Sequence, residues 1–397
     1  MTFSATDYLH MAHALRLAER GRYTTQPNPR VGCVIAHGEE IVGTGFHQRA
    51  GEPHAEVFAL RAAAARARGA TAYVTLEPCA HYGRTPPCAE ALIKAGVARV
   101  VAAVGDPNPH VAGRGFDLLR AAGIVVEVGL LQDAARELNL GFFSRIERAR
   151  PWLRVKLAMS LDGRTALANG DSKWLTGDAA RADVQRWRAR SSAILTGSGT
   201  VLADDPQLTV RLPLSSLCAD DAIAEDQGAA AAPASPALVP SAFPPMREDE
   251  RCTPPLRVVL DRCLRTPAGS HVLDGLAPTL LLHAAGATCP DQRCAHVELA
   301  VVAELDGALD LSAVLALLAA RGCNEVQVEA GPTLCGALFA AGLVDELLLY
   351  VAPLLLGDRA RPLLQLPALG DMAQRWQLQV VEQRQIGVDW RLRLRPA

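Results

Sequence analysis

Three residues that are far apart in the sequence have the types and flanking motifs of zinc ligands. His54 stands in "GEPHAEV", and Cys79 and Cys88 begin and end "CAHYGRTPPC". One histidine and two cysteines leave a fourth coordination position for water, which is typical of a catalytic zinc rather than a closed structural one. Zinc lowers the pKa of that water to ~7, which makes it a nucleophile at neutral pH. The sequence therefore predicts one zinc ion per chain, bound by these three residues.

Glu56 is the predicted proton shuttle of this site. It lies two residues after His54, where Pro53 predicts the first turn of a helix. Helical residues advance by about 100° each, so Glu56 is poorly placed as a second ligand but can lie beside the metal. There it can carry a proton from the water to a leaving amine.

The individual parts of this pattern are common, and only their combination is informative. A lone His-x-Glu is usually a solvated helix start, and two cysteines nine positions apart are usually unrelated core residues. Together they match the His-x-Glu…Pro-Cys signature of the zinc-dependent nucleobase deaminases.

Length, composition and charge limit the classes of protein that carry this site. A chain of 397 residues is too long for one ordinary hydrophobic core. Half of its residues are hydrophobic, and its formal net charge is −2. This charge gives no global preference for nucleic acid or an anionic membrane. The first twenty residues predict an amphipathic helix rather than a signal peptide, and no stretch approaches the ~20 apolar residues of a membrane span. Ten scattered cysteines favour reduced thiols, so we expect a cytoplasmic protein.

Strands and helices alternate in both halves, which predicts an α/β fold with two domains, 1–150 and 151–397. A hairpin over 31–46 and a helix over 53–69 open the first domain. Residues 213–255 contain eight prolines among alanines, serines and acids, and we expect them to form a largely disordered insertion in the second domain.

Eight consecutive motifs resemble the bifunctional riboflavin-biosynthesis deaminase/reductase family. "QPNPRVGCVI", "GFHQRAGEPHAE", "TLEPCAHYGRTPPC" and "VGDPNPHVAGRG" are similar to its deaminase, and "KLAMSLDGRTA", "DSKWLTG", "ILTGSGTVLADDPQLTVR" and "VEAGPTLCGALFAAGLVDELLLY" to its reductase. The resemblance implies an N-terminal cytidine-deaminase-like three-layer domain and a C-terminal dihydrofolate-reductase-like domain. It also implies the same zinc ligands and proton shuttle as above.

The resemblance implies two reactions on one small pyrimidine ribose phosphate. The first is hydrolytic deamination of 2,5-diamino-6-(ribosylamino)-4(3H)-pyrimidinone 5′-phosphate to 5-amino-6-(ribosylamino)uracil 5′-phosphate. The second is reduction of the ribosyl to the ribityl side chain by NADPH.

Residues of the reductase half are assigned through the same motifs. Those implied for NADPH are Ala158, Trp174, Thr200, Asp204, Gly331, Pro332, Thr333, Leu334, Cys335, Gly336 and Ala337. Those implied for the substrate are Ser172, Arg188, Leu208, Arg211 and Glu329. The step from a strand through Gly331-Pro332 into a helix also suits pyrophosphate, and the two arginines suit phosphate. We interpret Lys156 as a catalytic group that stabilises charge on the sugar, with a solvated strand-edge lysine as the alternative.

Substrate contacts in the deaminase half rest on residue chemistry alone. Arg84 and Thr85, in the loop between the cysteines, have the donors to bind a ribose phosphate, with a loop that merely re-routes the chain as the alternative. Asn28 is a candidate for the base edge, with a turn-forming asparagine as the alternative. His47 either faces the substrate or lies on the surface.

Three competing functions remain open at this level. A deaminase of bases in nucleic acid predicts a basic channel and stacking aromatic residues, which the near-neutral charge and 5% aromatic content disfavour. A zinc-stabilised binding protein predicts a fourth protein ligand and no need for Glu56. A decayed reductase half is disfavoured by its complete motifs. The sequence does not exclude a homo-oligomer.

Overall fold

The computed structural model describes residues 3–82, 86–109, 111–213, 253–288 and 297–397. Its contacts divide the chain into two units. The first unit is Met1–Trp152 with Leu315–Glu325, and the second is Leu153–Val314 with Val326–Ala397. The short segment Leu315–Glu325 thus packs with the first unit, although it lies in the second half of the sequence. Most of the predicted insertion lies outside the described residues.

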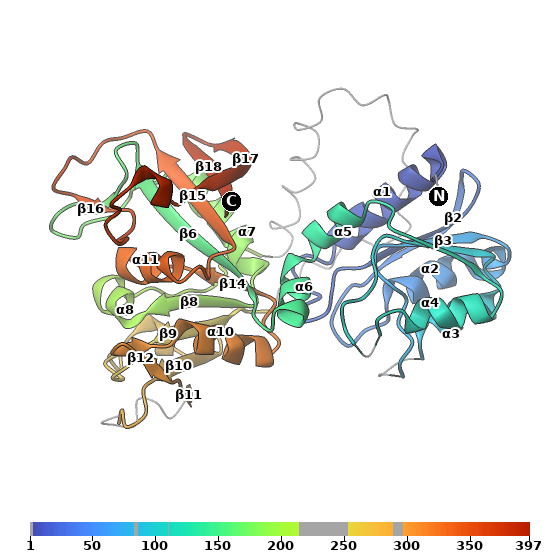
Figure 1. The fold of residues 1–397 in the computed structure, drawn as a ribbon, viewed down its shortest axis with the longest axis horizontal. Helices are drawn as coiled ribbons and strands as arrows, with labels where there is room; N and C mark the ends of the chain where they lie inside the picture. Colours follow the sequence, from blue (N-terminus) through green and yellow to red (C-terminus); the bar gives the residue numbers. More distant parts are fainter. Residues whose placement is uncertain (1–2, 83–85, 110, 214–252, 289–296) are drawn as a thin grey trace. The chain divides into compact units, whose positions relative to one another are not determined.

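The first unit contains a sheet of five described strands in the order β2-β1-β3-β4-β5 (Figure 1). The strands are β1 Gly32–His37, β2 Glu40–Phe46, β3 Thr71–Val74, β4 Arg99–Ala102 and β5 Val125–Val128. β1 is antiparallel to β2 and β3, whereas β3, β4 and β5 are parallel. The predicted hairpin over 31–46 is confirmed by the pairing of β1 with β2.

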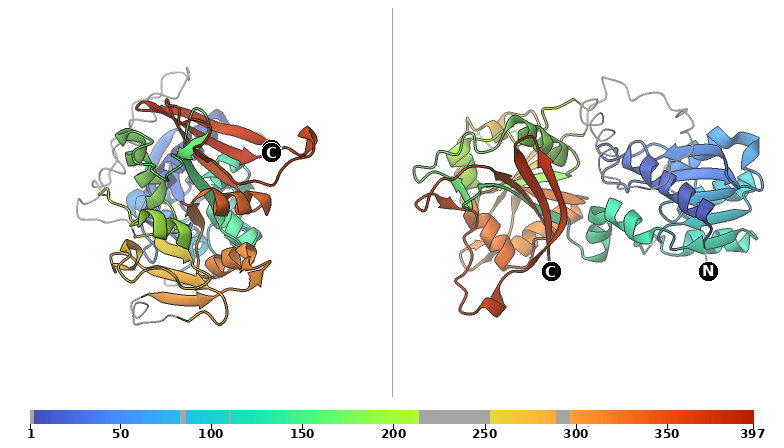
Figure 2. Two further views of the ribbon diagram at one scale, coloured as in Figure 1. Left: turned by 90° about the vertical axis from the view of Figure 1, so that its left-hand side faces the viewer. Right: turned by 90° about the horizontal axis from the view of Figure 1, so that it is seen from above.

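Helices cover both faces of this sheet and make three layers (Figure 1, Figure 2). The helices are α1 Ala5–Glu19, α2 Ala55–Ala63, α3 Cys88–Ala95, α4 Arg114–Ala121, α5 Gln132–Leu138 and α6 Leu140–Glu147. One buried cluster joins the sheet to α2, α3 and α4, and a second joins it to α1, α5 and α6. The three-layer prediction is therefore confirmed.

Two glycines of β2 allow α2 to approach the sheet closely. A Cβ on Gly43 would lie 2.3 Å from the carbonyl oxygen of Ala59, and one on Gly45 would lie 2.3 Å from that of Ala55. α2 is shorter than the helix predicted over 53–69, because Ala64 has a φ of 50° and the chain continues as a 3-10 helix. The close approach matters because the start of α2 carries His54 and Glu56.

The second unit contains a sheet of nine described strands in the order β11-β10-β9-β8-β14-β6-β15-β18-β17 (Figure 1, Figure 2). The strands are β6 Trp152–Ser160, β8 Ala193–Gly197, β9 Leu256–Leu260, β10 Thr279–His283, β11 Glu298–Val301, β14 Glu325–Val328, β15 Glu346–Ala352, β17 Leu378–Ile386 and β18 Asp389–Pro396. The short strands β7 Arg164–Ala166, β12 Glu304–Leu305, β13 Ala308–Leu309 and β16 Arg361–Pro362 form two further ribbons. The helices are α7 Asp178–Ala189, α8 Ser198–Asp204 and α11 Pro332–Ala340, and α10 Leu311–Ala320 begins in this unit and continues in the segment assigned to the first unit.

Within the described part of the chain, no helix is both long and apolar enough to cross a lipid bilayer.

A buried carboxylate ties three strands of the second unit together. Glu346 of β15 is fully buried and contacts Arg154 of β6 at 2.6 Å and Arg393 of β18 at 2.8 Å. Burial opposes its charged form, but the two arginines outweigh this and lower the pKa of Glu346 to about 2. The stabilisation is therefore fully present above the pKa of an unfolded glutamate, ~4.3, and is lost as the pH falls toward 2.

Replacing Glu346 by alanine is expected to lower the free energy of unfolding by about 3–5 kcal/mol, because Arg154 keeps its buried charge without this partner. Glu382 offers a matched control, because it also pairs with Arg393 but is 24% exposed. Its replacement by alanine is expected to cost clearly less, because Arg391 keeps Asp183 and Arg393 keeps Glu346 as a partner. Urea denaturation at pH 7 measures both values, and equal losses would contradict this account.

Candidate active sites

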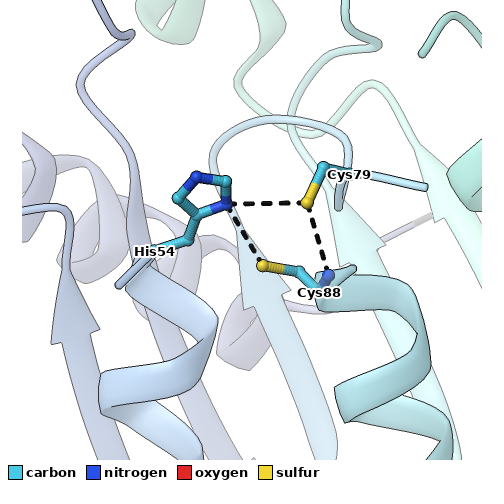
Figure 3. Close-up of side chains that lie close together, drawn as sticks. All are labelled: His54, Cys79 and Cys88. Atoms are coloured by element: carbon cyan, nitrogen blue, oxygen red, sulfur yellow. Dashed lines mark hydrogen bonds between the residues drawn. The ribbon is translucent and has the colours of Figure 1, made fainter. Parts of the chain in front are cut away.

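The three predicted zinc ligands converge in the first unit (Figure 3). The Nδ1 atom of His54 lies 3.5 Å from the Sγ atom of Cys79 and 3.3 Å from that of Cys88. All three ligand atoms lie within 4.8 Å of one another. His54 is the N-cap of α2, Cys88 is the first residue of α3, and Cys79 lies in the loop after β3. Three separate elements thus assemble a cradle of one nitrogen and two sulfurs.

The electrostatics of the cradle suit a divalent cation. A hydrogen bond from the Cys88 thiol lowers the pKa of Cys79 to about 4. Burial opposes this shift, and His54 adds to it. The backbone N–H of Cys88, at the start of α3, also donates to the Sγ atom of Cys79 at 3.3 Å. A thiolate stabilised at a helix N-terminus is the form that binds zinc. The donor set and its charge therefore fit zinc.

Glu56 lies in the first turn of α2 and is only 3% exposed. Burial raises the pKa of its carboxyl group, and His54 opposes this shift. Glu56 lines a cavity of about 550 Å³ together with His54 and Cys79. A buried carboxyl group at the wall of a cavity beside metal ligands is placed to exchange protons with a molecule in that cavity.

Asn28 and His47 line the same cavity. His47 is 2% exposed, so the surface alternative for it is wrong. Asn28 donates through Nδ2 to Nε2 of His47 at 3.1 Å, and Nδ1–H of His47 donates to the carbonyl oxygen of Pro53 at 3.1 Å. These bonds fix one tautomer of His47 and the orientation of the Asn28 amide, leaving its oxygen for other partners.

Further polar residues of this cavity were not assigned from the sequence: Glu77, His81, Asp106 and Asn108. Glu77 accepts backbone N–H bonds from Asp106 at 3.2 Å and from Gly113 and Gly115 at 3.0 Å, and so fixes the loop after β4. Burial raises the pKa of Asp106 to about 6. The sequence did contain a signal for Asp106. This residue follows β4, and β4 is the parallel neighbour of β3, the strand that leads to Cys79, so both residues lie at the same edge of the sheet.

Replacing Cys88 by serine is expected to lower zinc affinity by more than the roughly 10- to 100-fold that loss of an outer-shell partner costs, because a hydroxyl group is a much poorer zinc ligand than a thiolate. Zinc content after dialysis against a weak chelator measures the loss. Cys263 is an exposed cysteine outside the zinc cradle, so its replacement by serine should leave the zinc content unchanged. Full zinc retention by the Cys88 variant would exclude this residue as a ligand.

The second unit contains a larger cavity, of about 1110 Å³. The residues expected from the sequence that line it are Lys156, Ala158, Ser172, Trp174, Arg188, Thr200, Asp204, Arg211, Glu329, Gly331, Pro332, Thr333, Leu334 and Ala337. They come from β6, α7, α8 and α11, from the residues that follow β14, and from the connecting loops. α11 begins at Pro332 with Gly331 as its N-cap, which places free backbone N–H groups at the cavity wall.

Three residues expected from the sequence do not line this cavity. Leu208 is 2% exposed and packs in a core cluster, and Cys335 is fully buried. Gly336 lies against the chain at Gln365, where a Cβ would come within 2.0 Å of the carbonyl oxygen. These three residues shape the wall through packing rather than by facing the cavity.

Lys156, Arg188 and Glu329 form a partly buried charged group in the cavity wall. Arg188 donates from Nε and Nη2 to the two carboxylate oxygens of Glu329, both at 2.7 Å. Burial opposes the charge of Glu329, but Arg188 overcomes this and lowers its pKa to about 2. Burial also lowers the pKa of Lys156, with Glu329 opposing the shift. β6 lies between β14 and β15, so the alternative of Lys156 as a solvated strand-edge residue is wrong.

Some sequence-based assignments fall outside the described residues. They are Arg84 and Thr85. Arg211 is described and exposed, and its backbone N–H donates to Gln185 at 3.0 Å. Arg211 lines the cavity that Arg188 also lines.

The fold and the two sites together define a zinc-dependent deaminase domain joined to a reductase domain. Two family models match accordingly: the cytidine and deoxycytidylate deaminase zinc-binding region at residues 4–104, and the RibD C-terminal domain at residues 151–392. The chain belongs to the RibD family of riboflavin biosynthesis proteins.

Full-length relatives and solved structures support this membership. The chain is 49% identical to riboflavin biosynthesis protein RibD of Escherichia coli K12, over 96% of this chain and 97% of that protein. Acinetobacter baumannii RibD is 43% identical, with a TM-score of 0.85 and 99% of both chains covered. A diaminohydroxyphosphoribosylaminopyrimidine deaminase/5-amino-6-(5-phosphoribosylamino)uracil reductase from Thermotoga maritima is 30% identical, with a TM-score of 0.80 and 99% of both chains covered.

Proposed function

We propose that this chain catalyses two consecutive steps of riboflavin biosynthesis, one at each cavity. The first unit deaminates 2,5-diamino-6-(ribosylamino)-4(3H)-pyrimidinone 5′-phosphate, and the second unit reduces the ribosyl group of the product. The observation that carries the proposal is the triad of His54, Cys79 and Cys88 beside the buried Glu56, in a chain that also has a second cavity of about 1110 Å³. A binding protein has no need for a buried acid beside three metal ligands.

In the deaminase, His54, Cys79 and Cys88 would bind zinc, which supplies an activated water when bound. Glu56 accepts a proton from that water and gives it to the leaving amine, so that ammonia departs. The Asn28 amide, fixed by His47, binds the edge of the pyrimidine. Arg84 and Thr85 bind the ribose phosphate.

In the reductase, NADPH supplies the hydride when bound. The backbone N–H groups at the start of α11 bind its pyrophosphate, because the helix dipole favours negative charge there. Arg211 binds the substrate phosphate, and Glu329 holds Arg188 in place at the cavity wall. Lys156 is positioned to stabilise negative charge that develops on the sugar oxygen as its carbon accepts the hydride.

Ammonia release and NADPH oxidation, measured in one reaction, test the order of these steps. The diaminopyrimidinone phosphate alone should yield ammonia, and addition of NADPH should then give an equal amount of oxidised cofactor. Zinc removal should abolish ammonia release but leave the reduction of added 5-amino-6-(ribosylamino)uracil 5′-phosphate intact. NADPH oxidation without prior ammonia release would contradict the proposed order.

The expected partners are small molecules, namely the pyrimidine ribose phosphate and NADPH, rather than nucleic acid or membrane. A cytoplasmic location fits the six described cysteines, all of which are unpaired. Gel filtration of the zinc-loaded protein would determine whether the chain forms a homo-oligomer.

A further inference from the structure

We propose that Arg145 binds the phosphate of the deaminase substrate, and that Asn324, from the second half of the sequence, positions it. This inference deepens the proposed deaminase function and rests on it. Both residues belong to the first unit, which includes Leu315–Glu325. Arg145 lines the cavity that His54 and Cys79 also line. It therefore lies in the wall of the cavity that would hold the substrate.

The charges of this cavity leave an anion few places to bind. Among the described residues that line it, Arg145 is the only arginine or lysine. The carboxyl groups of Glu56, Glu77 and Asp106 line the same cavity and disfavour a second negative charge nearby. The phosphate is the anionic group of the proposed substrate. Its most favourable partner in the described wall is therefore the guanidinium group of Arg145.

Arg145 has a positive charge that the protein does not neutralise. Its side chain is half-buried, and burial lowers its pKa. Within the described part of the chain, no carboxylate lies within ion-pair distance of it. Its Nε–H donates to the Oδ1 atom of Asn324 at 2.6 Å, which leaves both terminal nitrogens with donors for a ligand. A half-buried cation of this kind gains a counterion and charge-assisted hydrogen bonds when a phosphate binds.

The sequence of α6 places Arg145 against Asn324. Gly141 and Arg145 are four residues apart in this helix and so lie on the same face. A Cβ on Gly141 would lie 2.5 Å from the carbonyl oxygen of Asn324, so the missing side chain allows the helix to approach this residue. One turn later, the side chain of Arg145 reaches the amide oxygen of Asn324. The close approach of the helix therefore sets the position of the guanidinium group.

Asn324 is itself held in one orientation. It is 5% exposed, and its Nδ2 atom donates to the carbonyl oxygen of Pro27 at 2.8 Å. This bond turns the amide oxygen of Asn324 toward Arg145. Pro27 precedes Asn28, the residue proposed to bind the base edge. One amide group thus connects the proposed phosphate contact to the loop of the proposed base contact.

A buried ion pair holds this part of the chain in the first unit. Glu325, the residue after Asn324, pairs with Arg30 at 2.8 Å, and the two side chains are 3% and 5% exposed. Arg30 is fixed in turn, because its Nη1 donates to the carbonyl oxygen of Leu138 at 2.7 Å. A residue of the reductase half of the sequence is therefore a built-in part of the deaminase cavity.

Steady-state kinetics of ammonia release by the full-length, zinc-loaded protein tests the proposal. The two substrates are the diaminopyrimidinone ribose phosphate and the same compound without its phosphate. Arg145→Ala should raise the KM for the phosphorylated compound by about 10- to 100-fold, the value of one or two charge-assisted hydrogen bonds. The kcat should be nearly unchanged, because the zinc ligands and Glu56 are not altered. The KM for the unphosphorylated compound should change by no more than about twofold.

Two control variants separate charge from packing. Arg136 of α5 lies over the ring of Phe143 at 4.2 Å, as Arg145 lies over Phe142 at 6.0 Å, but Arg136 does not line the cavity. Arg136→Ala should therefore have wild-type kinetics with both compounds. Arg145→Lys keeps the charge and should recover part of the lost affinity for the phosphorylated compound.

A double-mutant cycle tests the role of Asn324. The measured quantity is the ratio of kcat/KM for the phosphorylated compound to kcat/KM for the unphosphorylated one. Asn324→Ala should lower this ratio by about 3- to 10-fold in the wild-type background, since Arg145 loses its partner. It should leave the ratio unchanged in the Arg145→Ala background. An equal drop in both backgrounds would show that Asn324 does not act through Arg145.

Other outcomes would overturn the proposal as a whole. Equal losses with both compounds in Arg145→Ala would mean that Arg145 only supports the structure of the cavity. A wild-type protein with no preference for the phosphorylated compound would exclude phosphate recognition at this site. A wild-type protein that releases ammonia from neither compound would instead contradict the proposed function itself.

Discussion

Replacement of Glu56 by glutamine is expected to lower the deaminase kcat by about 10²- to 10⁴-fold while zinc stays bound. The amide has nearly the shape of the acid but cannot shuttle a proton from water to the leaving amine. Because Glu56 is buried two residues after a zinc ligand, an isosteric change should leave the cradle intact. Ammonia release and zinc content, measured on the same sample, separate the two effects.

The control for this experiment is Glu39, which is exposed in the turn between β1 and β2 and lies outside the cavity. Glu39→Gln should have wild-type activity. If Glu56→Gln kept full deaminase activity, the zinc site would serve stability or binding, as in the scaffold alternative. If it lost zinc as well as activity, Glu56 would act in assembling the metal site instead.

Replacement of Lys156 by methionine is expected to lower the reductase kcat by about 10²- to 10³-fold, because it removes a fixed positive charge from a cavity of low dielectric. The deaminase step should be unchanged. Oxidation of NADPH with 5-amino-6-(ribosylamino)uracil 5′-phosphate as substrate measures the effect. Lys94 is exposed on α3 and provides the control, so that Lys94→Met should have wild-type reductase activity.

The pH profile gives a second readout for Lys156. Burial lowers the pKa of this amine, so it loses its proton at a lower pH than an ordinary lysine does. The charged form is the active one, and the reductase kcat should therefore fall as the pH rises. Arginine at this position stays charged, so residual activity of Lys156→Arg should lack this decline. A methionine variant with normal kcat would exclude Lys156 from the chemistry.

The zinc site was predictable because its residues have chemistry that few other patterns explain. His54, Glu56, Cys79 and Cys88 combine ligand types with helix-start signals, and the structure brings the three ligands together. The loop position of Cys79 was less predictable. Its sulfur lies at the N-terminus of α3 because the chain folds back after β3, a tertiary feature that local sequence does not encode.

Other features were missed because their signals are spread along the chain. β17 is exposed along most of its length and lacks a clear apolar alternation, so propensity did not indicate a strand. Glu77 and Asp106 act through backbone bonds between distant loops. Cys335 and Gly336 belong to a motif whose neighbours face the cavity, but the helical period turns them to the buried side.

Mass spectrometry of the diaminopyrimidinone ribose phosphate after incubation with the zinc-loaded protein tests the central claim most directly. Hydrolytic deamination should add about 1 Da without NADPH, and hydride plus proton should add about 2 Da more when NADPH is present. Both shifts from one chain are the result that this account predicts. The absence of either shift from protein with full zinc content would contradict the claim that this chain carries out both reactions.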